Sequence, residues 1–191
     1  RVNRMDVPFY FRRNPEPGEP TPIGGFYTQE DVKEMVAYAA ERQIEIIPEI
    51  DMPAHSNAAL AAYPELTCPI VKSYIGVIPG LGGGNSGVIY CAGKDSAFTF
   101  LQNVLDEVMA LFPSRYIHLG GDEAQKGYWE KCPLCQARMK NEHLDNEEDL
   151  QGYFMKRMSD YVCSKGRKVI GWDELTNSCL LYTSPSPRDA H

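Results

Sequence analysis

Three short apolar runs, each preceded by an amphipathic helical pattern, constrain the fold of this chain most strongly. The runs are IEIIPEID at residues 44–51, RYIHLGG at residues 115–121 and RKVIGWDEL at residues 167–175. Apolar residues recur at helical spacing before them, over residues 29–42, 97–112 and 147–166. Strands that alternate with helices pair in parallel through crossover connections. The order therefore predicts an α/β fold with a parallel sheet, either an open sheet or part of a (β/α)8 barrel.

Local signals mark the limits of the predicted helices. Thr28 with Asp31 three residues later resembles a capping box at the start of the first helix. Gly166 is placed to end the third helix. In the second helix we expect one apolar face to enter the core, formed by Phe100, Val104, Val108 and Leu111.

Polar residues follow each predicted strand at its carboxyl end. They are Asp51 and His55 after the first strand, Asp122 and Glu123 after the second, and Trp172, Asp173 and Glu174 in the third. That rim carries the active site in a (β/α)8 barrel, and in an open α/β sheet the same ends line the ligand crevice. We therefore expect a functional site here, and we assign Asp173 and Glu174 no catalytic role.

The charge balance excludes some classes of partner. The chain of 191 residues carries a formal net charge of -7, whereas binding to nucleic acid needs clustered Lys and Arg. No apolar run approaches the length of a membrane span. We expect neither a nucleic-acid partner nor a membrane-spanning segment, and the oligomeric state stays open.

Two further motifs resemble ligand-binding motifs but lack some of the residues that those motifs require. GLGGGNSG at residues 80–87 has no Lys-Ser/Thr and no obvious strand before it, so a loop is favoured over a phosphate-binding P-loop. Cys132 and Cys135 form the one C-x-x-C motif. No second cysteine pair stands at finger-like spacing, which favours a local disulfide or two buried thiols over zinc. We predict no metal site and no cofactor.

The last thirteen residues, CLLYTSPSPRDAH, break with the alternating pattern. Their codons can be written as a sequencing-library adapter read in frame. We predict one domain over residues 1–178 and a non-native tail over residues 179–191, the alternative being a native Pro/Ser tail.

The adjacent acids Asp122 and Glu123 restrict the chemistry of the site. A glycosidase of the usual kind holds two carboxylates on opposite faces of the sugar, about 5 Å apart in retaining enzymes and farther in inverting ones. Neighbouring residues cannot easily straddle a sugar ring. The adjacent acids fit a different mechanism better. One acid protonates the leaving oxygen and the other stabilises charge on the substrate, as in hydrolysis with a 2-acetamido nucleophile.

Several long motifs resemble one known family. IIPEIDMPAHSNAALAAYPEL, YIHLGGDE with the following Trp129, VIGWDE and FYTQEDVKEMVAYAAERQIEIIPEID are together similar to the catalytic domain of family 20 glycoside hydrolases, the β-N-acetylhexosaminidases. The resemblance runs from about Arg1 to Leu175. Ala54 departs from it, because the family usually has glycine before the histidine.

The resemblance implies a role for each candidate residue. Glu123 would be the general acid and then the base, and Asp122 would orient the acetamido group. His118 would link Glu123 to Asp51 in a relay, His55 would belong to the same polar network, and Trp172 would form one wall of the sugar pocket. The implied substrate is an oligosaccharide or glycoconjugate with a terminal β-linked N-acetylhexosamine, with no cofactor.

The resemblance also implies the architecture and the setting. The three strands would be the third to fifth of a (β/α)8 barrel, which needs about 250 residues. This chain alone is therefore expected to be inactive. A periplasmic or secreted location is implied as well.

Two other functions remain open from the residues alone. A metal-dependent barrel hydrolase would use His55, His118, Asp122 and Glu123 as ligands, although such sites commonly use several histidines and the chain has four in all. A carbohydrate-binding module would keep Trp172 without the chemistry, and a Glu123→Gln change would then leave its function intact.

Overall fold

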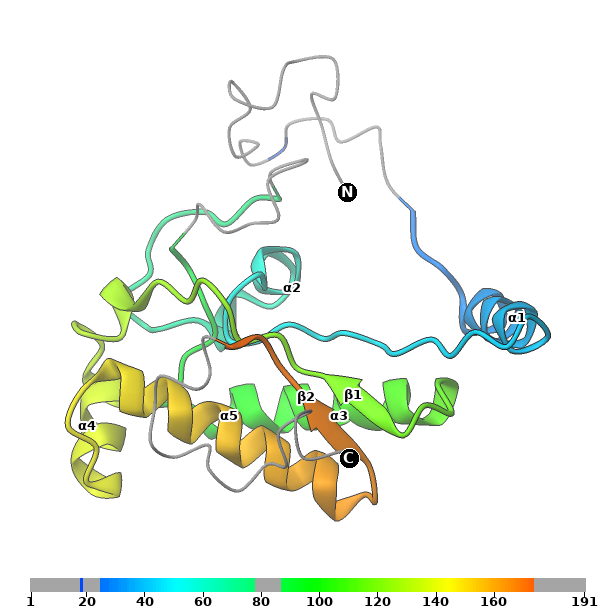
Figure 1. Ribbon diagram of the computed structural model, residues 1–191. Coiled ribbons are helices and arrows are strands. Elements are labelled where there is room, and N and C mark those ends of the chain that lie inside the picture. Colours follow the sequence, from blue (N-terminus) through cyan, green and yellow to red (C-terminus); the bar gives the residue numbers. More distant parts are fainter. Residues whose placement is uncertain (1–17, 19–24, 78–86, 174–191) are drawn as a thin grey trace.

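The computed structural model describes residue 18, residues 25–77 and residues 87–173 (Figure 1). The predicted tail at residues 179–191 and all of GLGGGNSG except Gly87 lie outside these residues. The elements follow in this order: α1 Gln29–Ala40, α2 Asn57–Ala62, η2 Pro64–Leu66, α3 Asp95–Leu111, β1 Tyr116–His118, η4 Lys126–Tyr128, α4 Pro133–Glu142, α5 Glu147–Ser164 and β2 Lys168–Ile170.

Three parallel segments form the centre of the described structure. β1 pairs with β2 in parallel, with Ile117 opposite Val169. On its other side β1 meets the first predicted strand through a parallel bridge between Glu49 and His118. Backbone bonds from His118 N to Pro48 O and from Ile50 N to His118 O, both 2.9 Å, hold that bridge. The predicted parallel α/β arrangement is therefore present.

The first predicted strand is less buried than expected. Ile44 and Ile47 are 58% and 41% exposed, although the apolar run was predicted to be a buried strand. Pro48 has no N–H to donate to a ladder, and the segment makes only the single bridge to β1. Within the described residues, Ile44 and Ile47 therefore remain in contact with solvent.

The helix limits follow the local signals. Thr28 and Asp31 form the predicted capping box of α1, because each side chain bonds the other residue's backbone N–H. Gly166, with φ 79°, follows the last turn of α5 in the left-handed region that favours glycine. α2 and α4 lie in segments for which the sequence predicted no helix.

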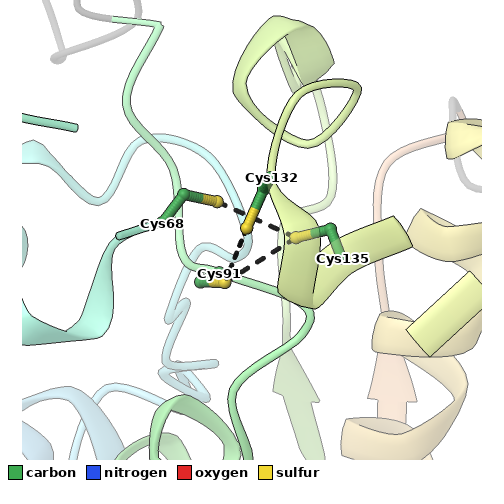
Figure 2. A group of neighbouring side chains, drawn as sticks. All are labelled: Cys68, Cys91, Cys132 and Cys135. Carbon is green, nitrogen blue, oxygen red and sulfur yellow. Dashed lines mark hydrogen bonds between the residues drawn. The ribbon is translucent and has the colours of Figure 1, made fainter. Parts of the chain in front are cut away.

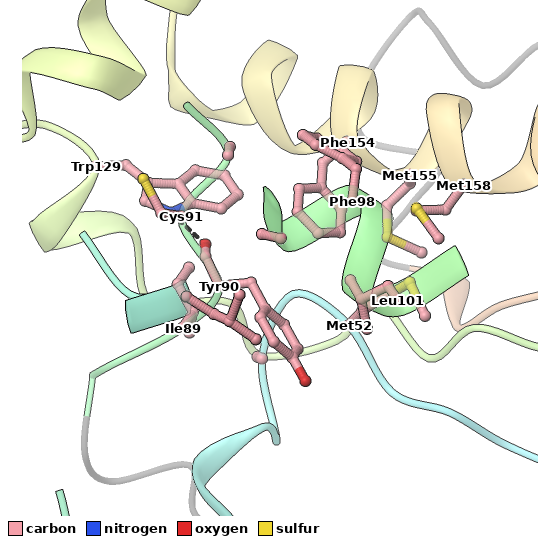
Figure 3. Packing of buried hydrophobic residues seen from close by; sticks show 14 of the residues in the cluster. Met52, Ile89, Tyr90, Cys91, Phe98, Leu101, Trp129, Phe154, Met155 and Met158 are labelled. Atoms are coloured by element: carbon pink, nitrogen blue, oxygen red, sulfur yellow. Dashed lines mark hydrogen bonds between the residues drawn. The ribbon is translucent and has the colours of Figure 1, made fainter. Parts of the chain in front are cut away.

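The core lies between α3 and α5, which run side by side beneath the strands (Figure 1). Phe98 of α3 packs on Phe154 of α5 with ring centroids 4.6 Å apart, and Trp129 lies 6.4 Å from the same ring (Figure 3). The prediction of which face of α3 enters the core was wrong, because the buried face is rotated from the predicted one. Its fully buried residues are Ala97, Phe98, Leu101, Leu105 and Met109, whereas the four predicted residues are half-buried.

The reason is that α3 is apolar over a wide arc, and packing against α5 selects the middle of that arc. α1 contacts α3, where Gln29 Nε2 donates to Glu107 Oε1 at 2.9 Å, but it keeps Met35 and Tyr38 exposed. No helix in the described part of the chain is long and apolar enough to cross a membrane.

Candidate active site

The end of the first parallel segment and the loop after β1 bring Asp51 against the two glycines of the HLGG motif. Met52 N donates to Leu119 O at 3.2 Å, which continues the parallel pairing beyond the bridge. Gly121 N then donates to Oδ1 of Asp51 at 3.1 Å. A Cβ atom on Gly120 would lie 1.8 Å from the same oxygen, and Gly120 has a φ of 66°. Gly120 therefore makes room for the carboxylate of Asp51, and Gly121 binds it by its N–H.

The surroundings of Asp51 favour its protonated form. Burial raises the pKa of Asp51 to about 6, the hydrogen bond from Gly121 opposes this shift, and the nearby charge of Asp122 adds to it. An acid that titrates near pH 6 beside a second acid can exchange a proton within the site at neutral pH.

His55 lies next to both adjacent acids. Its Nε2 lies 3.3 Å from Oδ2 of Asp122 and 3.4 Å from Oε2 of Glu123. The side chains of His55 and Asp122 are 21% and 23% exposed, whereas that of Glu123 is 71% exposed. Asp122 therefore lies inside the site, and Glu123 reaches outward from it.

Both His55 and Glu123 adopt an unfavourable backbone conformation. Their φ angles are 47° and 50°, in the left-handed region that non-glycine residues rarely occupy. Backbone strain of this kind costs about 1–3 kcal/mol at each residue and concentrates at functional sites. Two strained residues in direct contact mark this as the candidate catalytic centre.

The contacts of His118 differ from those predicted. We expected His118 to link Glu123 to Asp51, but its Nδ1 lies 3.2 Å from Oε1 of Glu49 and accepts a 3.0 Å hydrogen bond from Gly120 N. The histidine that touches the acids is His55. The reason is geometric: His118 lies within β1, opposite Glu49, before the chain turns at the glycines.

Trp172, just after β2, lies at the same end of the strands as Asp51 and Asp122. Its backbone N–H donates to Gly120 O at 2.9 Å, and its indole Nε1 donates to Oε1 of Glu49 at 3.0 Å. The ring lies 5.0 Å from that of His118, tilted by 61°, and is 48% exposed. The exposed indole therefore stands at the same edge of the sheet as the acids.

Sequence reasoning missed two residues that position this site. Glu49 joins His118 to Trp172, and its place before the predicted strand end carried no distinctive signal. Gln151, buried on α5, donates from Nε2 to Gly121 O at 2.7 Å and so fixes the loop that carries the acids. A polar residue inside the apolar pattern of α5 was the available signal for Gln151.

The described residues contain two clusters with the composition of a metal site. Asp51, His55 and Asp122 each place one ligand atom within 4.8 Å of the others. This cluster includes two of the four ligands that a metal-dependent hydrolase would need, with Asp51 as a third. The other cluster consists of four buried cysteines and lies in different loops.

A comparison with protein families matches residues 10–187 to the catalytic domain of glycosyl hydrolase family 20. The chain belongs to this family. A β-hexosaminidase of Porphyromonas gingivalis is 48% identical over 163 residues, which are 85% of this chain and 20% of that protein.

Solved structures of the family give the same result. The β-N-acetylhexosaminidase from Bacteroides fragilis aligns with a TM-score of 0.71 and 46% identity, over 92% of this chain and 33% of that one. The family 20 exo-β-N-acetylglucosaminidase from Vibrio harveyi, in complex with N-acetylglucosamine, aligns with a TM-score of 0.71 and 33% identity, over 83% of this chain and 24% of that one.

The family 20 structures are TIM-barrel enzymes, and this chain shares their mixed α/β character. The chain spans about a fifth to a third of the length of these relatives.

Proposed function

We propose that the complete protein removes terminal β-linked N-acetylhexosamine from oligosaccharides or glycoconjugates, with retention and with the substrate's 2-acetamido group as nucleophile. The single observation that carries this proposal is that Asp122 and Glu123 share one histidine, at 3.3 and 3.4 Å from His55 Nε2. A pair held on one side of the site cannot act as acid and nucleophile across a sugar ring. In the proposed mechanism the substrate's own 2-acetamido group therefore supplies the nucleophile.

The exposure of the two acids supports their division of labour. Glu123, the more exposed acid, is in position to protonate the glycosidic oxygen and later to activate water. Asp122 is more enclosed, and its buried Oδ1 accepts no hydrogen bond from an N–H or hydroxyl group of the described residues. That oxygen is suited to accept the acetamido N–H and to stabilise the positive charge of an oxazolinium intermediate.

Other residues of the site would orient the acids and the sugar. His55 would fix the two carboxylates relative to each other, and Asp51 would hold the loop through Gly121. Trp172 would offer its exposed face to the pyranose ring, held in orientation by Glu49. His118 would act through Glu49 and Trp172 and would not contact the acids.

We place the three parallel segments as the third, fourth and fifth strands of a (β/α)8 barrel. Their order along the sheet and the exposed Ile44 and Ile47 fit a sheet that continues beyond the first segment. The remaining strands would complete the sugar pocket, so the 191-residue chain alone should be inactive. A periplasmic or secreted location is part of the same proposal.

The test uses the complete protein expressed from its source gene. Hydrolysis of an aryl N-acetyl-β-glucosaminide is compared with that of the matching aryl β-glucoside, which lacks the acetamido group. Activity confined to the acetamido sugar supports a nucleophile supplied by the substrate. Comparable activity on the plain glucoside would mean that the enzyme supplies its own nucleophile, and the proposed mechanism would then be wrong.

A metal-dependent hydrolase is the second candidate, because Asp51, His55 and Asp122 are close enough to share one ion. Two of these groups are carboxylates and one is an imidazole, a donor set that a divalent metal can use. Loss of turnover on chelation, restored by added metal and unaccompanied by unfolding, would favour this function. Full activity in chelator would exclude it.

A further inference from the structure

Four cysteines from three separate segments of the sequence meet in one buried cluster (Figure 2). Cys68 follows η2, Cys91 precedes α3, and Cys132 and Cys135 begin α4. All four are at most 1% exposed. The sequence argument against metal considered only cysteines at close spacing, whereas the fold brings Cys68 and Cys91 to the C-x-x-C pair.

The distances between the sulfur atoms exclude disulfides in this structure. Cys68 and Cys135 are 3.8 Å apart, Cys91 and Cys132 are 3.8 Å apart, and Cys91 and Cys135 are 3.7 Å apart. A disulfide needs about 2.05 Å. Cys132 and Cys135 are themselves free and buried, so of the two alternatives left open for the C-x-x-C pair this structure has the two buried thiols and not the local disulfide.

The same distances match a tetrahedral metal site. Four sulfurs placed about 2.3 Å from one zinc ion lie about 3.8 Å from each other along the edges of the tetrahedron. The three short distances equal this edge, and all four sulfurs lie within 4.8 Å of one another. Four thiols collected without an ion would gain little from this spacing, because thiol hydrogen bonds are weak.

We propose that Cys68, Cys91, Cys132 and Cys135 bind one zinc ion in a closed structural site. Four protein sulfurs fill the tetrahedral coordination of zinc and leave no position for water or substrate, so the ion would be structural. Binding forms four Zn–S bonds and releases up to four thiol protons to solvent. The proposal is independent of the function proposed for the acids.

The backbone around the cluster is arranged to hold such an ion. Cys132 is the N-cap of α4, with Pro133 as the first residue of the helix and Cys135 in its first turn. A helix N-terminus stabilises negative charge, which favours thiolates at this place. A Cβ on Gly93 would lie 2.3 Å from the backbone of Leu134, so the segment after Cys91 touches the first turn of α4 directly through glycine.

The ion would stabilise a region that has little regular secondary structure. Between η2 and α3 the described chain has no helix or strand, and it is held by bonds such as Cys91 N to Leu66 O at 3.0 Å. Tyr90 O accepts from Trp129 Nε1 at 2.9 Å, and Tyr90 N donates to Pro53 O at 3.2 Å. The zinc site would thus brace the segment that follows Asp51 against the loop that follows Glu123.

Metal analysis of the complete protein tests the proposal directly. The protein is purified without added metal or chelator, its zinc is measured by mass spectrometry, and its thiols are alkylated after unfolding in the absence of reductant. The expected result is about one zinc per chain in excess of any other metal, with X-ray absorption showing four sulfurs at about 2.3 Å. Absence of zinc with four alkylatable thiols, disulfides in place of thiols, or iron in place of zinc would each overturn it.

A matched pair of variants separates this site from cysteine chemistry elsewhere. Cys91→Ser should lose the zinc and lower the melting temperature, whereas Cys163→Ser, which alters the exposed cysteine of α5, should keep both unchanged. Cys135→His, which can still ligate, should retain more zinc than Cys135→Ser even if both melt earlier. Equal zinc content in Cys91→Ser and the wild-type protein would contradict the assignment.

Discussion

Gly120 and Asp51 are in such close contact that the carboxylate occupies the place of a side chain at residue 120. A Cβ there would lie 1.8 Å from Oδ1 and 2.9 Å from Cα of Asp51. The second atom belongs to the backbone, so a change of side-chain rotamer cannot relieve the clash. Gly121 N holds the same oxygen from the other side.

Gly120→Ala should therefore displace Asp51 and the acid-bearing loop. We expect a loss of stability of about 1–3 kcal/mol from overpacking, increased by the left-handed φ of 66° at this residue. Activity of the complete protein should fall at least tenfold. Gly127→Ala is the control, because a Cβ at Gly127 would meet no atom within 4 Å. Thermal melting and kcat/KM of both variants measure the effect, and equal behaviour of the two would contradict it.

The role proposed for Glu123 predicts a dependence on the leaving group. Glu123→Gln keeps the shape of the side chain but cannot donate a proton, so hydrolysis of a poor leaving group such as an alkyl alcohol should fall by about 10²–10⁴. A dinitrophenyl glycoside leaves without protonation, and its cleavage step should fall far less. Steady-state and single-turnover rates on both substrates provide the measurement. An equal loss on both substrates would argue against the role of general acid.

The sequence predicted the parts of this site that depend on local patterns. The parallel order, the capping box at Thr28 and the glycine after α5 follow from spacing and from residue chemistry, which act within a few positions. The gathering of Asp51, His55, Asp122 and Trp172 at one edge also follows, because the carboxyl ends of parallel strands meet there.

The sequence could not identify the partners of individual side chains. His118 contacts Glu49 because the register of the bridge sets them opposite each other, and no local signal fixes that register. Cys68, Cys91 and the C-x-x-C pair lie in three separate segments of the sequence, and only tertiary packing brings them together. The exposure of Ile44 depends on what lies beside the first segment, which a pattern of apolar residues does not reveal.

The raised pKa of Asp51 predicts a pH-dependent cost to folding. Below about pH 4 the carboxyl is protonated in both states, so the cost is absent. As the pH rises from about 4 to about 6 the unfolded chain ionises first, and stability falls; above about pH 6 the cost is constant. Asp51→Asn keeps an oxygen that accepts from Gly121 and removes the charge.

The Asp51→Asn variant should be more stable than the wild-type protein by about 1–2 kcal/mol at pH 7.5, the full shift being reduced by solvent screening, and equally stable near pH 4. Urea unfolding of the complete protein between pH 4 and 8 measures this difference. Asp160→Asn, which alters an exposed acid of α5 paired with Lys156, is the control and should keep the wild-type pH dependence. A difference that is the same at every pH would mean that the cost does not come from ionisation.

Glu49 holds Trp172 by its indole N–H and touches His118 with the same oxygen. If the exposed indole face binds the sugar, Trp172→Ala should raise KM about tenfold or more by removing that apolar face. Trp172→Phe keeps a ring but loses the bond to Glu49, so it should raise KM less. Glu49→Gln keeps an acceptor for the indole and removes only the negative charge beside His118, so its effect should be smallest.

Saturation curves with the aryl N-acetyl-β-glucosaminide rank the three variants. The expected order of KM is Trp172→Ala, then Trp172→Phe, then Glu49→Gln, with kcat changed less than KM because none of these groups transfers a proton in the proposed mechanism. A fall in kcat at constant KM in both tryptophan variants would mean that Trp172 positions the acids and does not bind the sugar. Its backbone N–H already bonds Gly120 O next to Asp51. The ratio of the two effects therefore decides between a pocket wall and a positioning residue.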